Sequence, residues 1–178
     1  MRILVAGDLT LEPQVAGHAD AMFDVLCDPA LYAYEDEPPA SREWLRTRFA
    51  KLETRQSADG REQWLNWVIR MPPGDLIGFV QATVHRDGSA AVAYVLGSSY
   101  WGRGLARQAT AAMIDELVER YRVDRLFAVA VRRNLRSTRL LKRLGFALAP
   151  PELQVAHGIP PEEVLMIRAA RPEREPAA

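Results

Sequence analysis

Glycines and arginines gather in one short segment of the sequence, residues 100–107 (YWGRGLAR). Gly102 and Gly104 let a backbone come close to a ligand, and the apolar periodicity that follows predicts that a helix begins here. The free N–H groups of a helix N-terminus bind anions, and a pyrophosphate is their natural ligand. Arg103 and Arg107 add positive charge. We interpret the segment as an anion-binding loop, and a loop that only shapes a turn is the alternative.

Two other phosphate-binding motifs do not fit this segment. In the dinucleotide-binding fingerprint the third glycine, which must be small for close helix packing, would fall at Arg107. Asp124 does lie about twenty residues on, as the ribose-binding acid would, but the loop follows several antiparallel strands instead of opening the fold. A Walker loop needs Gly-Lys followed by Ser or Thr, which this segment lacks.

A second set of polar residues lies about thirty residues further on, where helical spacing predicts a helix over residues 134–144. One stripe of this helix begins with Asn134 and Ser137 and continues with apolar residues, so a polar pair opens an otherwise apolar face. Arg136, Arg139 and Arg143 share the opposite stripe. Each polar residue has a structural alternative, because Asn134 could cap the helix and Ser137 could bond back to a carbonyl.

The elements that must position these residues follow from hydrophobic patterning and turn signals. We expect strands at 9–13, 63–71, 76–85, 90–96, 125–131, near Gln154, and at 164–169. We expect helices at 16–27, from an N-cap at Ser41, at 103–121 and at 134–144. The helix after Ser41 is expected to bury Trp44, Leu45, Phe49 and Leu52.

The charges of the chain balance overall but not locally. The 178 residues include 23 Lys plus Arg and 23 Asp plus Glu. Residues 101–145 contain eleven basic and four acidic residues, so this stretch carries +7 and the remainder −7. Such asymmetry indicates an anionic ligand on one part and a cationic one on another.

Composition excludes several classes of protein. A hydrophobic fraction of 48% beside 26% charged residues is typical of globular proteins. Cys27 is the single cysteine and the three histidines are scattered, so we expect neither a disulfide within the chain nor a bound metal. No apolar run approaches the roughly 18 residues of a membrane span, and the N-terminus meets Asp8 too early for a signal peptide. We expect a cytoplasmic protein that binds no membrane.

Together the two polar segments resemble a known family. The loop from Tyr100 to Ala106, followed by Asn134-x-x-Ser137 and by Leu144-Gly145-Phe146, is similar to the GNAT superfamily of acetyltransferases and to its ribosomal-protein N-terminal (Rim-type) branch. Trp101 departs from the general loop pattern but fits the Rim-type one. The resemblance implies an α/β (α+β) GNAT fold over residues 1–170. Its sheet would be mixed, mostly antiparallel, seven-stranded and splayed in the middle, with helices on both faces. The terminal segment 171–178 (RPEREPAA) is expected to be a flexible tail.

The resemblance also implies how acetyl-CoA is held. Its pyrophosphate would contact the backbone of the loop, and its pantetheine would pair like an extra strand with Val95 and Leu96. Asn134 would hydrogen-bond the pantetheine arm, and Ser137 would lie near the thioester sulfur. The cofactor-binding residues are then Val95, Leu96, Gly102, Arg103, Gly104, Leu105, Ala106, Arg107 and Asn134. Many relatives place a tyrosine acid four residues after Ser137, but Leu141 stands there.

The chemistry expected is direct attack of an amine on the thioester. A backbone N–H near Leu96 could polarise the carbonyl. Ser137 is too weak an acid to give up its proton, so we expect it to stabilise the departing sulfur, and water is the other proton donor to consider. No base is evident. An α-amine, with a pKa near 7.7–8.0, is partly neutral at pH 7, whereas a lysine amine near 10.4 is almost wholly protonated, which favours a protein N-terminus or another low-pKa amine as acceptor.

Acidic and aromatic residues before the second helix are the candidates for binding this amine. They are Tyr34, Glu35 and Asp36, with Glu37 beside them, and a solvated acidic loop is the alternative. Trp64 and Trp67 are expected on opposite faces of a strand, one in the core and the other a candidate wall of the pocket. Tyr94 alternates with core positions, and His157 lies in a late loop, so each fits a structural role as well as a site role.

Two other functions compete with acetyl transfer. A non-catalytic acyl-CoA-binding module is the main alternative, because the expected tyrosine and base are missing. Binding of nucleic acid by the +7 stretch predicts a steep salt dependence. We expect no nucleic-acid partner, because no row of aromatic residues accompanies those arginines. The expected partners are acetyl-CoA and an amine, in a monomer or homodimer.

Overall fold

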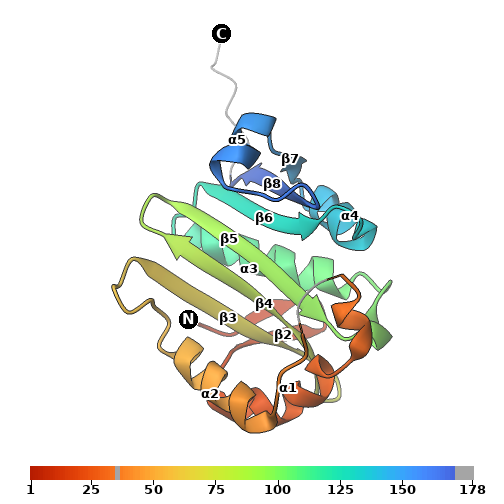
Figure 1. Cartoon of the computed structure of the whole chain (residues 1–178). Coiled ribbons are helices and arrows are strands. Elements are labelled where there is room, and N and C mark those ends of the chain that lie inside the picture. The colour runs from red at the N-terminus through yellow and green to blue at the C-terminus, as the bar shows by residue number, and fades with distance from the viewer. Residues whose placement is uncertain (35–36, 171–178) are drawn as a thin grey trace.

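The computed structural model describes residues 1–34 and 37–170. In this part of the chain eight strands form one sheet, and five α-helices pack around it (Figure 1). The strands are β1 (Leu4–Ala6), β2 (Leu9–Pro13), β3 (Glu62–Met71), β4 (Asp75–His85), β5 (Ser89–Leu96), β6 (Arg125–Val131), β7 (Ala147–Leu148) and β8 (Glu163–Ala169). The α-helices are α1 (Ala19–Leu26), α2 (Arg42–Glu53), α3 (Leu105–Arg120), α4 (Leu135–Arg143) and α5 (Pro151–Ala156), and 3₁₀ helices are η1 (Ala16–His18), η2 (Pro29–Tyr32) and η3 (Ser98–Tyr100). The predicted tail at 171–178 lies outside the described residues.

The sheet is mixed and mostly antiparallel, as predicted. Its strand order is β1-β2-β3-β4-β5-β6-β8-β7, and the β5–β6 pair is parallel while the other described pairs are antiparallel. A parallel pair needs a crossover between its strands, and α3 supplies it.

The sheet differs from the predicted seven strands at three places in the chain. The strand expected near Gln154 is instead α5, which Pro151 starts at the first helical position, where its fixed φ favours a helix. Gly7, with φ 60°, turns the chain so that β1 pairs with β2. The two-residue β7 adds the other edge.

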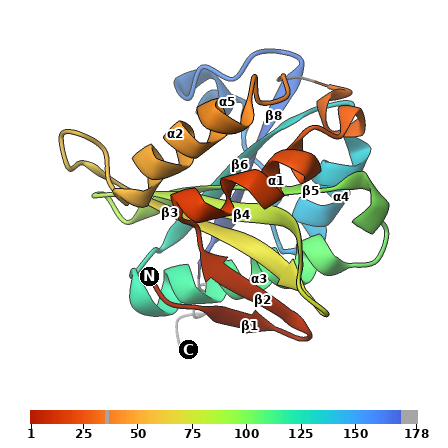
Figure 2. The ribbon, with the colours of Figure 1, turned by 90° about the horizontal axis from the view of Figure 1, so that it is seen from below.

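Helices cover both faces of the sheet, as predicted, and divide the core in two. Figure 2 shows α1 and α2 on one side and α3 on the other. On the first side Met22 of α1 and Phe49 of α2 pack in a buried cluster with Val68 of β3. On the second side Met113 of α3 and Leu141 of α4 belong to the larger cluster.

Two of the four residues predicted to be buried in α2 are buried, whereas Leu52 is half-buried and Trp44 is exposed. Ser41 does cap the helix, because its side chain accepts a hydrogen bond from the backbone N–H of Trp44 at 3.0 Å. Leu45 and Phe49, one helical turn apart, face the core, but Trp44 stays 47% exposed. Successive helical residues lie about 100° apart, so Trp44 cannot share the face of Leu45.

The sheet opens between β5 and β6, which confirms the predicted splay. These strands pair over three positions, Ser89–Ala91 with Arg125–Phe127. Beyond them β5 continues alone on that side to Leu96, while β6 stays paired with β8 up to Val131. The last five residues of β5 therefore present a free strand edge inside the sheet.

Candidate active site

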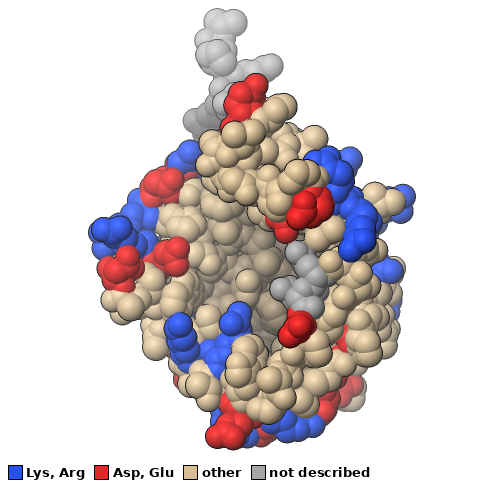
Figure 3. Space-filling model, viewed as in Figure 1, with Lys and Arg blue, Asp and Glu red and all other residues tan. Residues whose placement is uncertain are grey.

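A cleft of about 470 Å³ lies at this opening and reaches both faces of the sheet. Phe79 and Val95, which pack with the α1–α2 cluster, line it together with Leu140 and Ala106, which pack with the α3–α4 cluster. The space-filling view shows this side of the molecule hollowed, with uncharged residues over much of the hollow (Figure 3). The cleft thus joins the predicted cofactor segments to the segment between α1 and α2.

The end of β5 turns its backbone toward the cleft. Gly97 donates its N–H to the carbonyl of Ile77 at 2.9 Å, on the β4 side. Along an antiparallel ladder successive residues face opposite ways, so the N–H and carbonyl of Leu96 face the opening. The Leu96 carbonyl accepts a hydrogen bond there from the indole Nε1 of Trp101 at 2.7 Å. Its N–H is aimed at the space where the expected polarising contact requires a donor.

The N-terminus of α3 is uncapped and carries no negative charge. Gly104 occupies the N-cap position with φ 77°, a left-handed conformation that favours glycine, and it brings no side chain to the free N–H groups. The first helical bond runs from Gln108 N–H to the Gly104 carbonyl at 3.1 Å, and the N–H groups of Leu105, Ala106 and Arg107 have no partner in the described part of the chain. The first turn contains no acid. This terminus fits a phosphate group.

Arginine side chains surround the loop of residues 100–107, and one of them connects it to the cleft. Arg103 and Arg107 are exposed, and the Arg103 guanidinium lies 6.0 Å from the ring centre of Tyr100. Arg136 of α4 stacks on Trp101, with its guanidinium carbon 3.7 Å from the ring centre, and both residues line the cleft. The helical stripes assigned Arg136 to the opposite side from Asn134 and Ser137. That separation does not hold at the first turn of α4, where the long arginine side chain reaches Trp101.

Asn134 caps α4, as its structural alternative predicted. Its Oδ1 accepts the backbone N–H of Ser137 at 3.1 Å. The Nδ2 group has no partner among the residues the structure describes, and Asn134 lines the cleft. A single Asn134 side chain can therefore cap the helix with its oxygen and still donate two hydrogen bonds.

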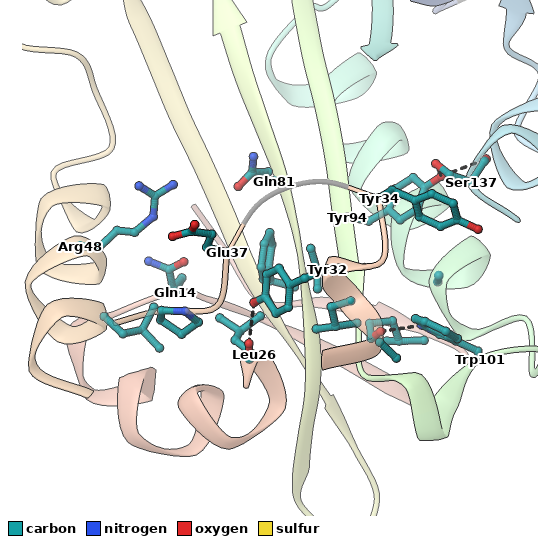
Figure 4. Close-up of a pocket in the computed structure, with 18 of the residues that line it drawn as sticks. Gln14, Leu26, Tyr32, Tyr34, Glu37, Arg48, Gln81, Tyr94, Trp101 and Ser137 are labelled. Carbon is teal, nitrogen blue, oxygen red and sulfur yellow. Dashed lines mark hydrogen bonds between the residues drawn. The ribbon is translucent and has the colours of Figure 1, made fainter. Parts of the chain in front are cut away.

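The hydroxyl of Ser137 does not bond back to its own helix. Its Oγ lies 2.9 Å from the phenol oxygen of Tyr94, which also donates to the Ser137 carbonyl at 3.2 Å (Figure 4). Tyr94 is thus a residue of the cleft, and its burial raises the pKa of its phenol to about 12. The position four residues after Ser137 points elsewhere, because Leu141 is buried in the core.

The acceptor side of the cleft begins at Tyr34. This residue is 39% exposed, lines the cleft, and has the guanidinium carbon of Arg133 5.7 Å from its ring centre. Glu35 and Asp36 lie outside the described residues. Glu37 lines the cleft and is the single acid among the described residues that do so.

The end of the cleft opposite Tyr94 is formed by polar residues. The sequence did not point to them. Figure 4 shows Gln14, Arg48 and Gln81 there, near Glu37 and away from Tyr94. They come from three separate segments, so no spacing in the sequence could have indicated them.

Other sequence candidates lie away from the cleft. Trp67 is fully buried in the core, whereas Trp64 lies beside Lys51 and is absent from the described lining of the cleft. The ring of His157 packs against Phe127, with 5.7 Å between ring centres. In the described ranges no three His, Cys, Asp or Glu side chains cluster as a metal site would require, and no helix is long and apolar enough to cross a membrane.

Solved structures of acetyltransferases share this fold. An acetyltransferase of the GNAT family from Bacillus anthracis is 16% identical, with a TM-score of 0.75 over 95% of this chain and 99% of that one. The ribosomal L7/L12 α-N-protein acetyltransferase RimL, solved in complex with coenzyme A, is 17% identical, with a TM-score of 0.79 over 94% and 98%. A ribosomal-protein-S5-alanine acetyltransferase from Vibrio fischeri is 19% identical, with a TM-score of 0.78 over 98% and 100%.

The sequence itself establishes the family. The model of the acetyltransferase (GNAT) domain matches residues 8–147. The chain therefore belongs to the GNAT family, and the protein is an acetyltransferase.

Proposed function

We propose that this enzyme transfers the acetyl group of acetyl-CoA to a primary amine, either a protein N-terminal α-amine or the amine of a small molecule. One observation carries the proposal. The free edge of β5, the uncapped N-terminus of α3 and the Ser137 hydroxyl meet at one cleft that continues to the segment before α2. Residues 1–170 are taken as the acetyltransferase domain.

Three groups of residues are assigned to acetyl-CoA. The backbone from Gly102 to Arg107 would hold the pyrophosphate, supported by the free N–H groups at the start of α3. The edge of β5 at Val95 and Leu96 was expected to pair with the pantetheine, and the backbone of Leu96 would do so, because the N–H and carbonyl of Val95 face β4. Asn134 would donate from Nδ2, which its cap leaves available. RimL, solved with coenzyme A, shares the fold and supports this assignment.

Acetyl-CoA, when bound, supplies an activated thioester whose acetyl group passes to a nitrogen while the sulfur leaves as a thiol. The Leu96 N–H would stabilise negative charge on the carbonyl oxygen, since it faces the opening. Ser137 would donate a hydrogen bond to the sulfur as the C–S bond breaks. It would not surrender its proton, because a thiol with a pKa of about 8.5 is far more acidic than a serine hydroxyl. The proton lost by the nitrogen passes to the departing sulfur, directly or through water, so that CoA leaves as the thiol.

The acceptor would approach from the side of Tyr34 and Glu37. The Glu37 carboxylate attracts a cationic amine, and the described lining of the cleft contains no other acid. An α-amine needs less help than a lysine amine to become neutral, which favours an N-terminal or other low-pKa amine. Structures named for protein N-terminal acetylation are among those that share this fold, which supports the Rim-type assignment.

The alternative is a non-catalytic acyl-CoA-binding module, favoured by the burial of Leu141 where many relatives carry a tyrosine acid. Thiol release from acetyl-CoA, measured with a panel of amines and N-terminal peptides, separates the two functions. Acetyl transfer predicts release with at least one acceptor class. Tight binding of acetyl-CoA with no turnover on any acceptor would instead establish the alternative.

Substitution of Ser137 tests the assigned chemistry. Hydrogen bonds to charged groups contribute about 1.5–3 kcal/mol, so Ser137→Ala should lower kcat by about 12- to 160-fold with little change in acetyl-CoA affinity. Ser99→Ala removes an exposed hydroxyl outside the described lining of the cleft and serves as the control. Unchanged turnover in Ser137→Ala would remove this serine from the mechanism.

A further inference from the structure

Tyr94 and Ser137 form a contact between two elements that the open sheet would otherwise leave apart. Tyr94 comes from the free edge of β5 and Ser137 from the first turn of α4. Their hydroxyl oxygens lie 2.9 Å apart, and both residues line the cleft. The tyrosine ring also packs against the α3–α4 core, so its position is fixed by packing.

Counting donors and acceptors shows what this contact can do. The phenol has one proton, and either Ser137 oxygen is within its reach, at 2.9 Å for Oγ and 3.2 Å for the carbonyl. When the phenol donates to Oγ, the serine proton is free to point into the cleft. When the serine donates to the phenol instead, the phenol proton can go to the Ser137 carbonyl, and the serine has no proton left for a ligand. A negatively charged acceptor in the cleft therefore favours the order phenol to serine to acceptor, in which each bond strengthens the next.

The phenol itself is a donor and not a proton source. Burial raises the pKa of Tyr94 to about 12, more than three units above that of a thiol near 8.5, so the tyrosine stays neutral beside a thiolate. Nor does Tyr94 replace the tyrosine missing at Leu141, because its hydroxyl is directed at the serine.

We propose that Tyr94 is the positioning residue that turns the Ser137 hydroxyl toward the leaving sulfur. This inference rests on the proposed function, since it needs a thioester sulfur near Ser137. Tyr94 acts through the serine. Without the phenol the serine hydroxyl is free to rotate, and the carbonyl of the N-cap residue Asn134, three positions earlier, becomes an available acceptor.

Tyr94→Phe tests the proposal, with Tyr121→Phe as the matched control. Tyr121 is also partly buried, packs at the edge of the same core and has a pKa raised by burial, but it is absent from the described lining of the cleft. We expect Tyr94→Phe to lower kcat by about 2- to 12-fold, which corresponds to the contribution of one neutral hydrogen bond. The KM for acetyl-CoA should stay within twofold of wild type. In a Ser137→Ala background, Tyr94→Phe should lower kcat by less than twofold.

A binding measurement reports on the sulfur without turnover. Affinities for CoA and for desulfo-CoA, which lacks the sulfur, are compared at pH 9, above the thiol pKa of about 8.5. Wild type and Tyr121→Phe should prefer CoA. Tyr94→Phe and Ser137→Ala should both lose most of that preference.

The outcomes separate this inference from the proposed function. The positioning role would be overturned if the effects of Tyr94→Phe and Ser137→Ala on kcat multiply in the double variant. It would also be overturned if Tyr94→Phe keeps the preference for CoA over desulfo-CoA. If wild type acetylates no amine but Tyr94→Phe still loses the CoA preference, the proposed function fails and the positioning role stands. If Tyr94→Phe does not fold, 3-fluorotyrosine at position 94 keeps the hydroxyl and strengthens it as a donor. It should maintain or raise kcat, and a fall would refute the proposal.

Discussion

Gly78 is the position where a single added methyl group should do most damage to the cleft. It lies on β4 opposite the end of β5, and a Cβ built there would sit 2.1 Å from the Val95 carbonyl oxygen and 2.9 Å from the Leu96 Cα. Carbon and oxygen normally approach to about 3.3 Å, so Gly78→Ala must push β5 away by roughly 1 Å. The atoms in the way are backbone, which cannot rotate aside as a side chain would.

Overpacking usually lowers the free energy of unfolding by about 1–3 kcal/mol. We expect the upper end, about 3 kcal/mol, because the strand pair itself must separate. For a chain of this length that corresponds to a fall in Tm of about 6–12 °C. CoA affinity should fall as well, since the shift moves the Leu96 carbonyl that holds Trp101.

Urea unfolding followed by tryptophan fluorescence measures the stability, and titration with CoA measures the binding. Gly74→Ala is the control, because an added Cβ meets no atom within 4 Å there and the φ angle of Gly74 is not positive. It should be neutral or stabilise by up to about 1 kcal/mol. A Gly78→Ala protein as stable as Gly74→Ala would refute the close approach of β4 to β5.

Three further predictions concern the cap, an ion pair and a stacked arginine. Asn134→Ala should cost about 1 kcal/mol in urea unfolding, whereas Asn134→Asp keeps the cap oxygen and should lose CoA affinity alone, by about 2- to 12-fold, if Nδ2 donates to the ligand. Hydrogen bonds from Arg70 hold the pKa of Glu12 below its ordinary value of 4.5, so this pair stabilises the fold above that pH and the contribution is lost as pH falls through the lower, folded-state pKa. Glu12→Gln should therefore be less stable than wild type at pH 7. Between pH 5 and 3 it should lose less further stability than wild type, and an equal further loss in the two proteins would contradict this prediction. Arg136→Ala should weaken CoA binding about 2- to 5-fold in titrations, and Arg139→Ala, which removes the same charge from an exposed site on the same helix, should not.

Local chemistry explains which parts of the fold were predictable. The strand at Arg125–Val131 and the cap of α2 at Ser41 follow from short-range pattern, and both are confirmed. The strand predicted near Gln154 is wrong, because Pro150 and Pro151 interrupt the apolar pattern and Pro151 is a normal first residue of a helix. The extra pairing of β1 with β2 depends on contacts to the rest of the sheet, which no local pattern records.

The sequence by itself determined the family and pointed to the uncapped N-terminus of α3 that we propose binds an anion, because glycines at fixed spacing act within one short segment. It also placed Asn134 and Ser137 one turn apart at the start of α4. Only the tertiary structure decided that Tyr94 belongs to the cleft and not to the core alone, since its partner Ser137 lies 43 residues away along the chain. The polar end formed by Gln14 and Gln81 likewise exists only after folding, because strand pairing and helix packing, and not sequence spacing, bring distant side chains to one opening.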